Sequence, residues 1–145
     1  MVLFLNRWYK KFLADLLRAE RDENFARNGG LDKYDNRIPK KTTIKGLLNC
    51  LNKEQLMEFV TPVVSQRYDD IASNSVFKDG FYFHKSKTGE TYVYYEVERG
   101  CLSGLVEDLD PYKVFGSFLL CYLRTFNHWP KDGNEYLPPP VQLDI

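Results

Sequence analysis

The chain has 145 residues and balances twenty Lys/Arg against twenty Asp/Glu. Its length is typical of one domain, and a chain of this size builds a core without help from a metal or a disulfide. A net charge of zero argues against a general nucleic-acid binder, which normally carries a marked basic excess. The odd number and wide spacing of Cys50, Cys101 and Cys121 are typical of reduced thiols and argue against a secreted disulfide scaffold.

Charge is unevenly distributed along the chain. Residues 1–60 hold twelve Lys/Arg and eight Asp/Glu, whereas residues 61–145 hold eight and twelve. The asymmetry reflects either solvated helix faces or one face that attracts a basic partner and another that attracts an acidic one. The N-terminal apolar run is short and precedes its charges, unlike a secretory signal, and no run approaches the length of a membrane span. We therefore expect a soluble, cytoplasmic protein without a membrane partner.

An amphipathic helix is predicted over residues 3–27, where apolar residues including Phe12 and Leu16 recur at helical spacing. Acidic residues are mixed into its polar face, which favours packing on a core over a position on a membrane surface. Gly29 and Gly30 predict its end, because glycine suits the left-handed position that follows many helices. A polar loop is predicted over residues 28–41.

Two short helices are predicted after this loop. One of the threonines at 42–43 can cap a helix that runs to Cys50. Asn52 and Gln55 have capping-box spacing, which predicts that a second helix begins at Asn52. Pro62 is expected to kink or break this second helix, because proline lacks the backbone N–H that a helix interior needs.

Residues 80–98 predict a β-hairpin, with runs of aromatic and β-branched residues on either side of a loop at 86–90. Gly89 is expected to supply the positive φ that a short loop needs. Because side chains alternate across a strand, we assign an apolar face and an outer face. The apolar face is predicted to hold Phe81, Phe83, Val93, Tyr95 and Val97, and the outer face Tyr82, His84, Tyr92, Tyr94, Glu96 and Glu98.

A buried helix is predicted to begin at Asp110-Pro111, since Asp is a good N-cap and Pro suits the first helical position. The residues up to 127–128 are apolar on most sides, so we expect this helix to lie against the apolar face of the hairpin. Residues 101–109 form either a third strand or a structured loop. The last segment, 131–145, contains three consecutive prolines, which favour an extended tail; a strand at a sheet edge, a disordered tail and a docking peptide are the alternatives.

These elements predict an α+β fold, with four or five helices packed around a small antiparallel sheet built on the central β-hairpin. A single globular domain is expected to span residues 1–145. Neither a cofactor nor a metal is expected, because the sequence contains no Cys-x-x-Cys, no His-x-x-x-His and no Gly-rich phosphate loop.

The outer face of the hairpin is the candidate site. Ten tyrosines exceed the need of a core of this size, and tyrosine supplies contact area at binding surfaces. Glu96 and Glu98 would complement a basic protein partner, whereas a covering helix, such as the N-terminal one, is the structural alternative. We expect a non-enzymatic, protein-binding inhibitor, such as a bacterial immunity protein or antitoxin that occludes a basic, nuclease-like partner.

Two other functions stay open. A nucleic-acid-binding regulator would contact phosphates through the densest basic cluster of the chain, which consists of Arg37, Lys40, Lys41 and Lys45. A small enzyme would use His84 with Glu96 as an acid/base pair, or Cys101 with a histidine as a nucleophile pair. Each of these alternatives depends on which side chains the fold brings together.

Overall fold

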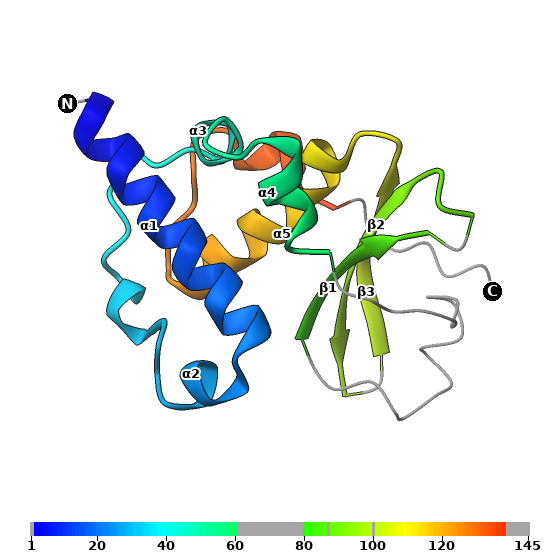
Figure 1. Ribbon diagram of the computed structural model, residues 1–145, viewed down its shortest axis with the longest axis horizontal. Helices are drawn as coiled ribbons and strands as arrows, with labels where there is room; N and C mark the ends of the chain where they lie inside the picture. The colour runs from blue at the N-terminus through cyan, green and yellow to red at the C-terminus, as the bar shows by residue number, and fades with distance from the viewer. Residues whose placement is uncertain (1, 61–79, 87, 100, 139–145) are drawn as a thin grey trace. The chain divides into compact units, whose positions relative to one another are not determined.

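The structure, a computed structural model, describes residues 2–60, 80–86, 88–99 and 101–138 (Figure 1). The chain divides into two compact units. Unit 1 comprises Met1–Phe59 and Leu119–Glu135, and unit 2 comprises Val60–Phe118 and Tyr136–Ile145. Their boundary falls within helix α5 (Pro111–Thr125), so each unit contains part of that helix. That one domain spans the whole chain stays a prediction.

The predicted α+β class is confirmed, since the described residues form five α-helices and a three-stranded antiparallel sheet. The described part of the chain contains no helix with the length and apolar character of a membrane span. Besides α5, the elements are α1 (Val2–Arg21), α2 (Glu23–Arg27), η1 (Asp32–Tyr34), α3 (Ile44–Leu48), α4 (Lys53–Met57), β1 (Gly80–Lys85), β2 (Tyr92–Glu98), β3 (Cys101–Asp108) and η3 (Gly133–Tyr136), where η marks a 3-10 helix.

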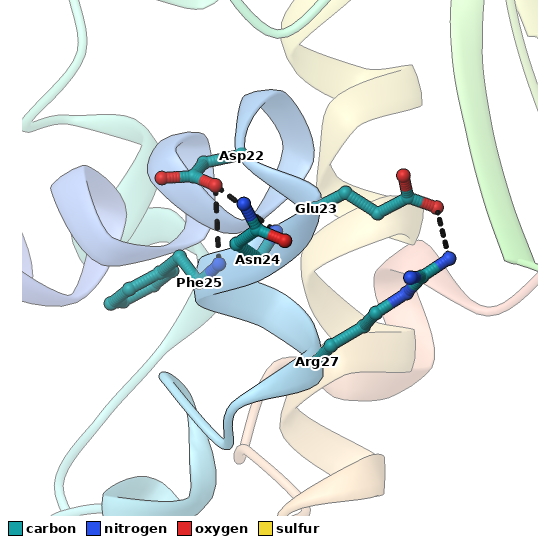
Figure 2. A network of polar contacts seen from close by, with 5 residues as sticks. All are labelled: Asp22, Glu23, Asn24, Phe25 and Arg27. Atoms are coloured by element: carbon teal, nitrogen blue, oxygen red, sulfur yellow. Dashed lines mark hydrogen bonds and ion pairs between the residues drawn. The ribbon is translucent and has the colours of Figure 1, made fainter.

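The helix predicted over residues 3–27 is in fact two helices, because Asp22 interrupts it. Asp22 has an extended backbone, and its carboxylate accepts the backbone N–H groups of Asn24 at 3.0 Å and Phe25 at 3.2 Å. Figure 2 shows this cap together with the ion pair between Glu23 and Arg27, whose charged atoms are 3.0 Å apart. A short acidic side chain that competes with helical hydrogen bonds therefore ends α1 and starts α2.

The core of unit 1 is centred on Phe12 of α1. Its ring centroid lies 5.1 Å from that of Trp8, 4.9 Å from that of Tyr34 and 6.1 Å from that of Phe126. The contacts with Tyr34 and Phe126 are edge-to-face, an arrangement that stabilises aromatic pairs beyond the area they bury. The prediction that the N-terminal helix packs on a core is therefore confirmed.

The loop predicted over residues 28–41 is joined to α1 through Tyr34. The Tyr34 hydroxyl donates to Oδ2 of Asp15 at 2.5 Å, and Nζ of Lys33 lies 2.9 Å from the same oxygen. Burial of the Asp15 carboxyl raises its pKa, but hydrogen bonds from Tyr34 and Lys33 and the charge of Lys33 outweigh burial and leave the pKa below its usual value. Asp15 therefore stays ionised and holds the loop on the helix.

Both short helices begin at the caps that the sequence predicts. The Thr43 hydroxyl accepts the N–H of Gly46 at 3.0 Å, at the start of α3. Asn52 and Gln55 form the reciprocal capping box that starts α4. The predicted break at Pro62 lies outside the described residues.

A second cap of α3 comes from a distant part of the sequence. The carboxylate of Asp132 accepts the backbone N–H of Ile44 at 3.0 Å and that of Lys45 at 2.9 Å. Negative charge is favourable at a helix start, where backbone N–H groups have no partner within the helix. The segment after α5 is thereby joined to the start of α3.

In unit 2 the strands follow the order β1-β2-β3, with antiparallel pairing throughout (Figure 1). Tyr82 lies opposite Tyr95, and Phe83 lies opposite Tyr94. Residues opposite each other in an antiparallel pair project from the same face. One face therefore carries Phe81, Phe83, Tyr92, Tyr94 and Glu96, and the other face carries Tyr82, His84, Val93, Tyr95 and Val97.

The predicted division of the hairpin into two faces is therefore wrong. It placed Phe81 and Phe83 with Val93 and Tyr95, whereas the pairing places them on opposite faces. A pairing shifted by one residue exchanges the faces of one strand relative to its neighbour. Because both strands carry aromatic residues on both faces, their composition does not reveal which pairing is correct.

The segment at 101–109, which the sequence left open between strand and loop, is strand β3. Its pairing with β2 shifts between Tyr94, opposite Val106, and Glu96, opposite Ser103. The extra residue on β3 forms a bulge, and Gly104 there has a φ of 65°, which L side chains rarely adopt. Gly89 has a φ of 77° in the first hairpin loop, as predicted.

The first half of α5 packs on one face of the sheet. The ring of Phe115 lies 5.3 Å from that of Phe83, and the ring of Phe118 lies 6.4 Å from both Phe81 and Tyr94. Asp110 caps this helix by accepting the N–H of Tyr112 at 3.0 Å. The predicted start of the helix is confirmed. Its predicted packing on Phe81 and Phe83 is also confirmed, whereas Val93 and Val97 lie on the other face of the sheet.

The C-terminal segment is not extended throughout its described part. Residues Gly133–Tyr136 form η3, and the Ser117 hydroxyl donates to the Tyr136 carbonyl oxygen at 2.7 Å. Gly116 leaves room for the Tyr136 ring, since a Cβ at this position would overlap a carbon of that ring. The predicted tail from residue 139 onward lies outside the described residues.

We expect Asp22→Ala to lower the free energy of unfolding by about 1 kcal/mol, because the first N–H groups of α2 lose their acceptor. Asp22→Asn keeps an acceptor and is the matched control. Unfolding in urea, followed by circular dichroism, measures both. Equal stability of the two variants would contradict the role of the cap.

We expect Gly116→Ala to lower the free energy of unfolding by about 1–3 kcal/mol, because the added methyl overlaps the Tyr136 ring. Alanine is otherwise the better helix former by about 1 kcal/mol, so a loss of stability has to come from the overlap. In the double variant Gly116→Ala/Tyr136→Ala, the alanine at 116 should no longer be destabilising. An additive double-mutant cycle would show that the ring does not rest on Gly116.

Candidate functional site

The six residues predicted as one partner-binding face lie on two faces of the sheet. Tyr82 and His84 project from one face, whereas Tyr92, Tyr94 and Glu96 project from the other. Tyr94 and His84 are buried, and Glu98 is the one residue of the six that is exposed. The predicted residues therefore do not form a single accessible surface.

A helix covers part of this predicted face, which was the alternative to a partner-binding surface. The helix that packs on Tyr94 is α5, through Phe118. The N-terminal helix was the predicted cover, but its described aromatic contacts are with residues of unit 1. Tyr92 stacks on the neighbouring Phe83, with ring centroids 6.2 Å apart, and is half-buried.

On the other face, His84 is part of a buried hydrogen-bonded pair with Tyr95. Its Nδ1 lies 2.6 Å from the carbonyl oxygen of Lys85, which can only accept, so Nδ1 carries the proton. Its Nε2 lies 2.9 Å from the Tyr95 hydroxyl, which therefore donates to the neutral ring. Burial lowers the pKa of His84 despite the opposing effect of the Lys85 carbonyl. Both ring nitrogens are engaged in holding the sheet face together.

Tyr82 completes this buried cluster. Its ring stacks on that of Tyr95, with centroids 5.3 Å apart and planes 17° apart. Val93, Tyr95 and Val97 form a hydrophobic cluster here, with Leu102 and Leu105 packed against it. Burial, followed by the charge of Tyr82, raises the pKa of Tyr95, so its hydroxyl stays protonated. The cluster is typical of a core.

The pairing also separates the residues of the enzyme alternatives. Glu96 lies opposite Phe81, on the face away from His84, so the two cannot form an acid/base pair. Cys101 pairs with Glu98 and His84 with Val93, five residues further along β2. At about 3.3 Å per residue, the two positions are about 16 Å apart along the sheet, too far for a nucleophile pair.

The remaining described chemistry offers no replacement site. Burial raises the pKa of the Cys50 thiol, more than the charge of Lys10 lowers it, so this thiol is not activated as a thiolate. Among the residues that the structure describes, no three His, Cys, Asp or Glu side chains are grouped so as to hold a metal ion.

A concentration of carboxylates lies at one end of the sheet, where the β1–β2 loop meets the end of β3. The Thr91 hydroxyl donates to Oε2 of Glu107 at 2.5 Å. Asp108 lies opposite Tyr92, and the N–H of Asp110 bonds to its carboxylate at 2.9 Å. We call this region the acidic end, and it comprises Glu90, Glu107, Asp108, Leu109 and Asp110.

The acidic end combines carboxylates with an exposed apolar side chain. The backbone N–H of Asp110, followed by the nearby Lys113, holds the pKa of Asp108 below its usual value. Nζ of Lys113 lies 3.5 Å from the Asp108 carboxylate, and Lys85 lies at the same end of β1. Leu109 is 72% exposed. The sequence does not indicate this region, because it leaves residues 101–109 open between a strand and a loop and does not show that they pair with β2.

The predicted basic residues, by contrast, are all exposed in unit 1: Arg37, Lys40, Lys41 and Lys45. The segment around them is hydrogen-bonded to residues that follow α5, including Asp132. Trp129 in that following segment is 49% exposed, with the Arg124 guanidinium carbon 5.2 Å from its ring centroid. Nothing in the sequence indicates that Trp129 is exposed, because a tryptophan beside Pro130 is equally compatible with a core position.

We expect the free energy of unfolding of the wild type to fall as the pH drops below 6.5, in part because of His84. The pKa of His84 in the folded state lies below its unfolded value of 6.5. Below pH 6.5 the unfolded chain therefore binds a proton more readily than the folded chain does, which favours unfolding. His84→Gln should lose less stability than the wild type between pH 7 and about pH 5. Denaturant unfolding at both pH values measures this, and an unchanged pH dependence in the variant would contradict it.

Comparisons of the chain with models of protein families, with curated proteins and with solved structures found no match. The described residues themselves therefore have to indicate what the protein binds. They provide a structural histidine, a carboxylate-rich end of the sheet in unit 2, and a basic, partly aromatic surface in unit 1.

Proposed function

We propose that the protein is a protein-binding inhibitor whose acidic end docks on a basic, nuclease-like partner and occludes it. Bacterial immunity proteins and antitoxins are the class of such inhibitors that we favour. The observation that carries the proposal is the concentration of four carboxylates at the same end of the sheet as the exposed Leu109, with Lys85 and Lys113 as lysines of the described residues at that end. An exposed apolar side chain close in sequence to several like charges suits a partner surface of opposite charge.

The distribution of charge between the units supports the same proposal. Unit 2 contains six Lys/Arg and ten Asp/Glu, whereas unit 1 contains fourteen and ten. An acidic unit accelerates encounter with a basic partner and disfavours partners of like charge. Occlusion of the partner requires no titrating group in the inhibitor, which fits the engaged ring nitrogens of His84.

The first test is capture of the tagged full-length protein from its own cells, with and without nuclease treatment, followed by mass spectrometry. A stoichiometric, basic protein that survives nuclease treatment supports the proposal. The purified partner then serves as the probe for binding at several salt concentrations. Affinity that does not fall with salt would overturn the electrostatic part of the proposal.

We expect Glu90→Gln and Glu107→Gln each to weaken binding of this partner about 1.5- to 5-fold at low salt, mainly through slower association. Leu109→Ser should speed dissociation instead, because it removes an exposed apolar contact without disturbing the core. Surface plasmon resonance separates the two rates.

Glu54→Gln and Glu135→Gln provide the matched control, since they remove the same charge from exposed positions of unit 1. The control variants should bind as the wild type does. If they weaken binding as much as Glu90→Gln and Glu107→Gln, overall charge rather than the acidic end determines affinity, and the proposed surface is wrong.

A further inference from the structure

Two segments of unit 1 that are distant in sequence form one continuous surface. The N–H of Asn36 donates to the Phe126 carbonyl oxygen at 3.0 Å, and Nδ2 of Asn127 donates to Oδ1 of Asn36 at 2.9 Å. Further along, Nε2 of His128 lies 3.2 Å from the Thr42 carbonyl oxygen. With the two bonds from Ile44 and Lys45 to Asp132, these contacts hold residues 35–45 against residues 126–133.

This surface joins the predicted basic cluster to cations that the sequence places some ninety residues away. We call it the Trp129 surface. Its exposed cations outnumber its acids, which are Asp35, Asp132 and Glu135, by six to three. Both oxygens of Asp132 accept backbone N–H groups, so this carboxylate is already engaged. The cations are Arg37, Lys40, Lys41, Lys45, Arg124 and Lys131.

The indole of Trp129 is held in place although half of it is exposed. Gly133 lies against it so closely that a Cβ there would be 3.2 Å from Cε2 and Nε1 of the indole. The Arg124 guanidinium lies over the ring at 5.2 Å, a cation–π contact. A ring that is ordered before binding loses little conformational entropy when a ligand stacks on it.

We propose that the Trp129 surface binds single-stranded nucleic acid. The lysines and arginines would contact the phosphates, and an unpaired base would stack on the Trp129–Arg124 pair. Cationic grooves with exposed aromatic side chains are the general means of binding single strands. A duplex offers phosphates but keeps its bases stacked internally, so the half-exposed indole favours a single strand over a duplex.

The zero net charge of the chain does not oppose this inference. It results from opposite charges on the two units, and unit 1 by itself carries four more basic than acidic residues. The surface is also separate from the acidic end, which belongs to unit 2. The inference therefore goes beyond the proposed inhibitor function, and either one can fail while the other holds.

Fluorescence anisotropy with labelled oligothymidylate and oligouridylate tests the inference on the full chain. Strands of about 20 nucleotides exceed the site size of most single-strand binding domains. We expect dissociation constants below about 100 μM at low salt, affinity that falls with salt, and weaker binding of a blunt DNA duplex. A difference in affinity between oligothymidylate and oligouridylate would show whether the surface prefers DNA or RNA.

Variants then locate the site. Trp129→Ala should weaken binding about fivefold or more, whereas Phe4→Ala, which removes a 69% exposed aromatic side chain elsewhere in unit 1, should not. The double variant Lys40→Gln/Lys41→Gln should lower the slope of log affinity against log salt by about 1 to 1.5. The double variant Lys10→Gln/Lys53→Gln, which removes two exposed lysines elsewhere in unit 1, is the charge-matched control. The lysine pair keeps the test valid if Trp129→Ala fails to fold.

Three outcomes would overturn the inference. The first is no binding of either strand at about 100 μM protein. The second is duplex binding at least as tight as single-strand binding, which would remove the role of the indole. The third is equal affinity for labelled polyglutamate, unaffected by Trp129→Ala, which would make the surface a docking site for acidic protein.

Discussion

The antiparallel register between β1 and β2 decides which groups of unit 2 are available for binding. With Tyr82 opposite Tyr95, the aromatic side chains divide between a face that packs on α5 and a face centred on the His84–Tyr95 hydrogen bond. Polar side chains on these faces, such as those of His84 and Tyr95, take part in structural contacts. Exposed carboxylates lie instead at the ends of the strands, with Glu98 at one end of β2 and Glu90 and Glu107 in the acidic end at the other. The proposed binding surface is therefore at an end of the sheet and not on a face of the hairpin.

Local signals in the sequence were sufficient for most helix starts and insufficient for the sheet. Thr43, Asn52 and Asp110 cap their helices as predicted, because a cap depends on residues within one turn. The register depends instead on how two strands pair, and strands with aromatic residues on both faces carry no alternation that would fix it. Asp22 was missed because its neighbours continue the helical pattern. The composite surface around Trp129 depends on long-range hydrogen bonds that no local pattern encodes.

The division of charge between the units changes what the overall composition means. A chain with a net charge of zero looks electrostatically neutral, yet unit 1 carries an excess of four positive charges and unit 2 an excess of four negative charges. Screening limits the reach of each excess to about 8 Å at physiological ionic strength. The overall neutrality therefore does not describe either unit taken by itself. Steering of a basic protein and contact with phosphates are compatible properties of one neutral chain.

Unit 1 is built from segments near both ends of the described chain, and this affects the order in which the protein folds during synthesis. The hydrogen bonds from Asn127 to Asp35, from His128 to Thr42 and to Asp132 from Lys45 join residues 92, 86 and 87 positions apart. A ribosome adds about 5–20 residues per second, so residues 1–59 wait several seconds for residues 119–135. Until then Phe12 lacks the ring of Phe126 and α3 lacks its second cap. The aromatic face of α1 is meanwhile exposed to chaperones and to other nascent chains.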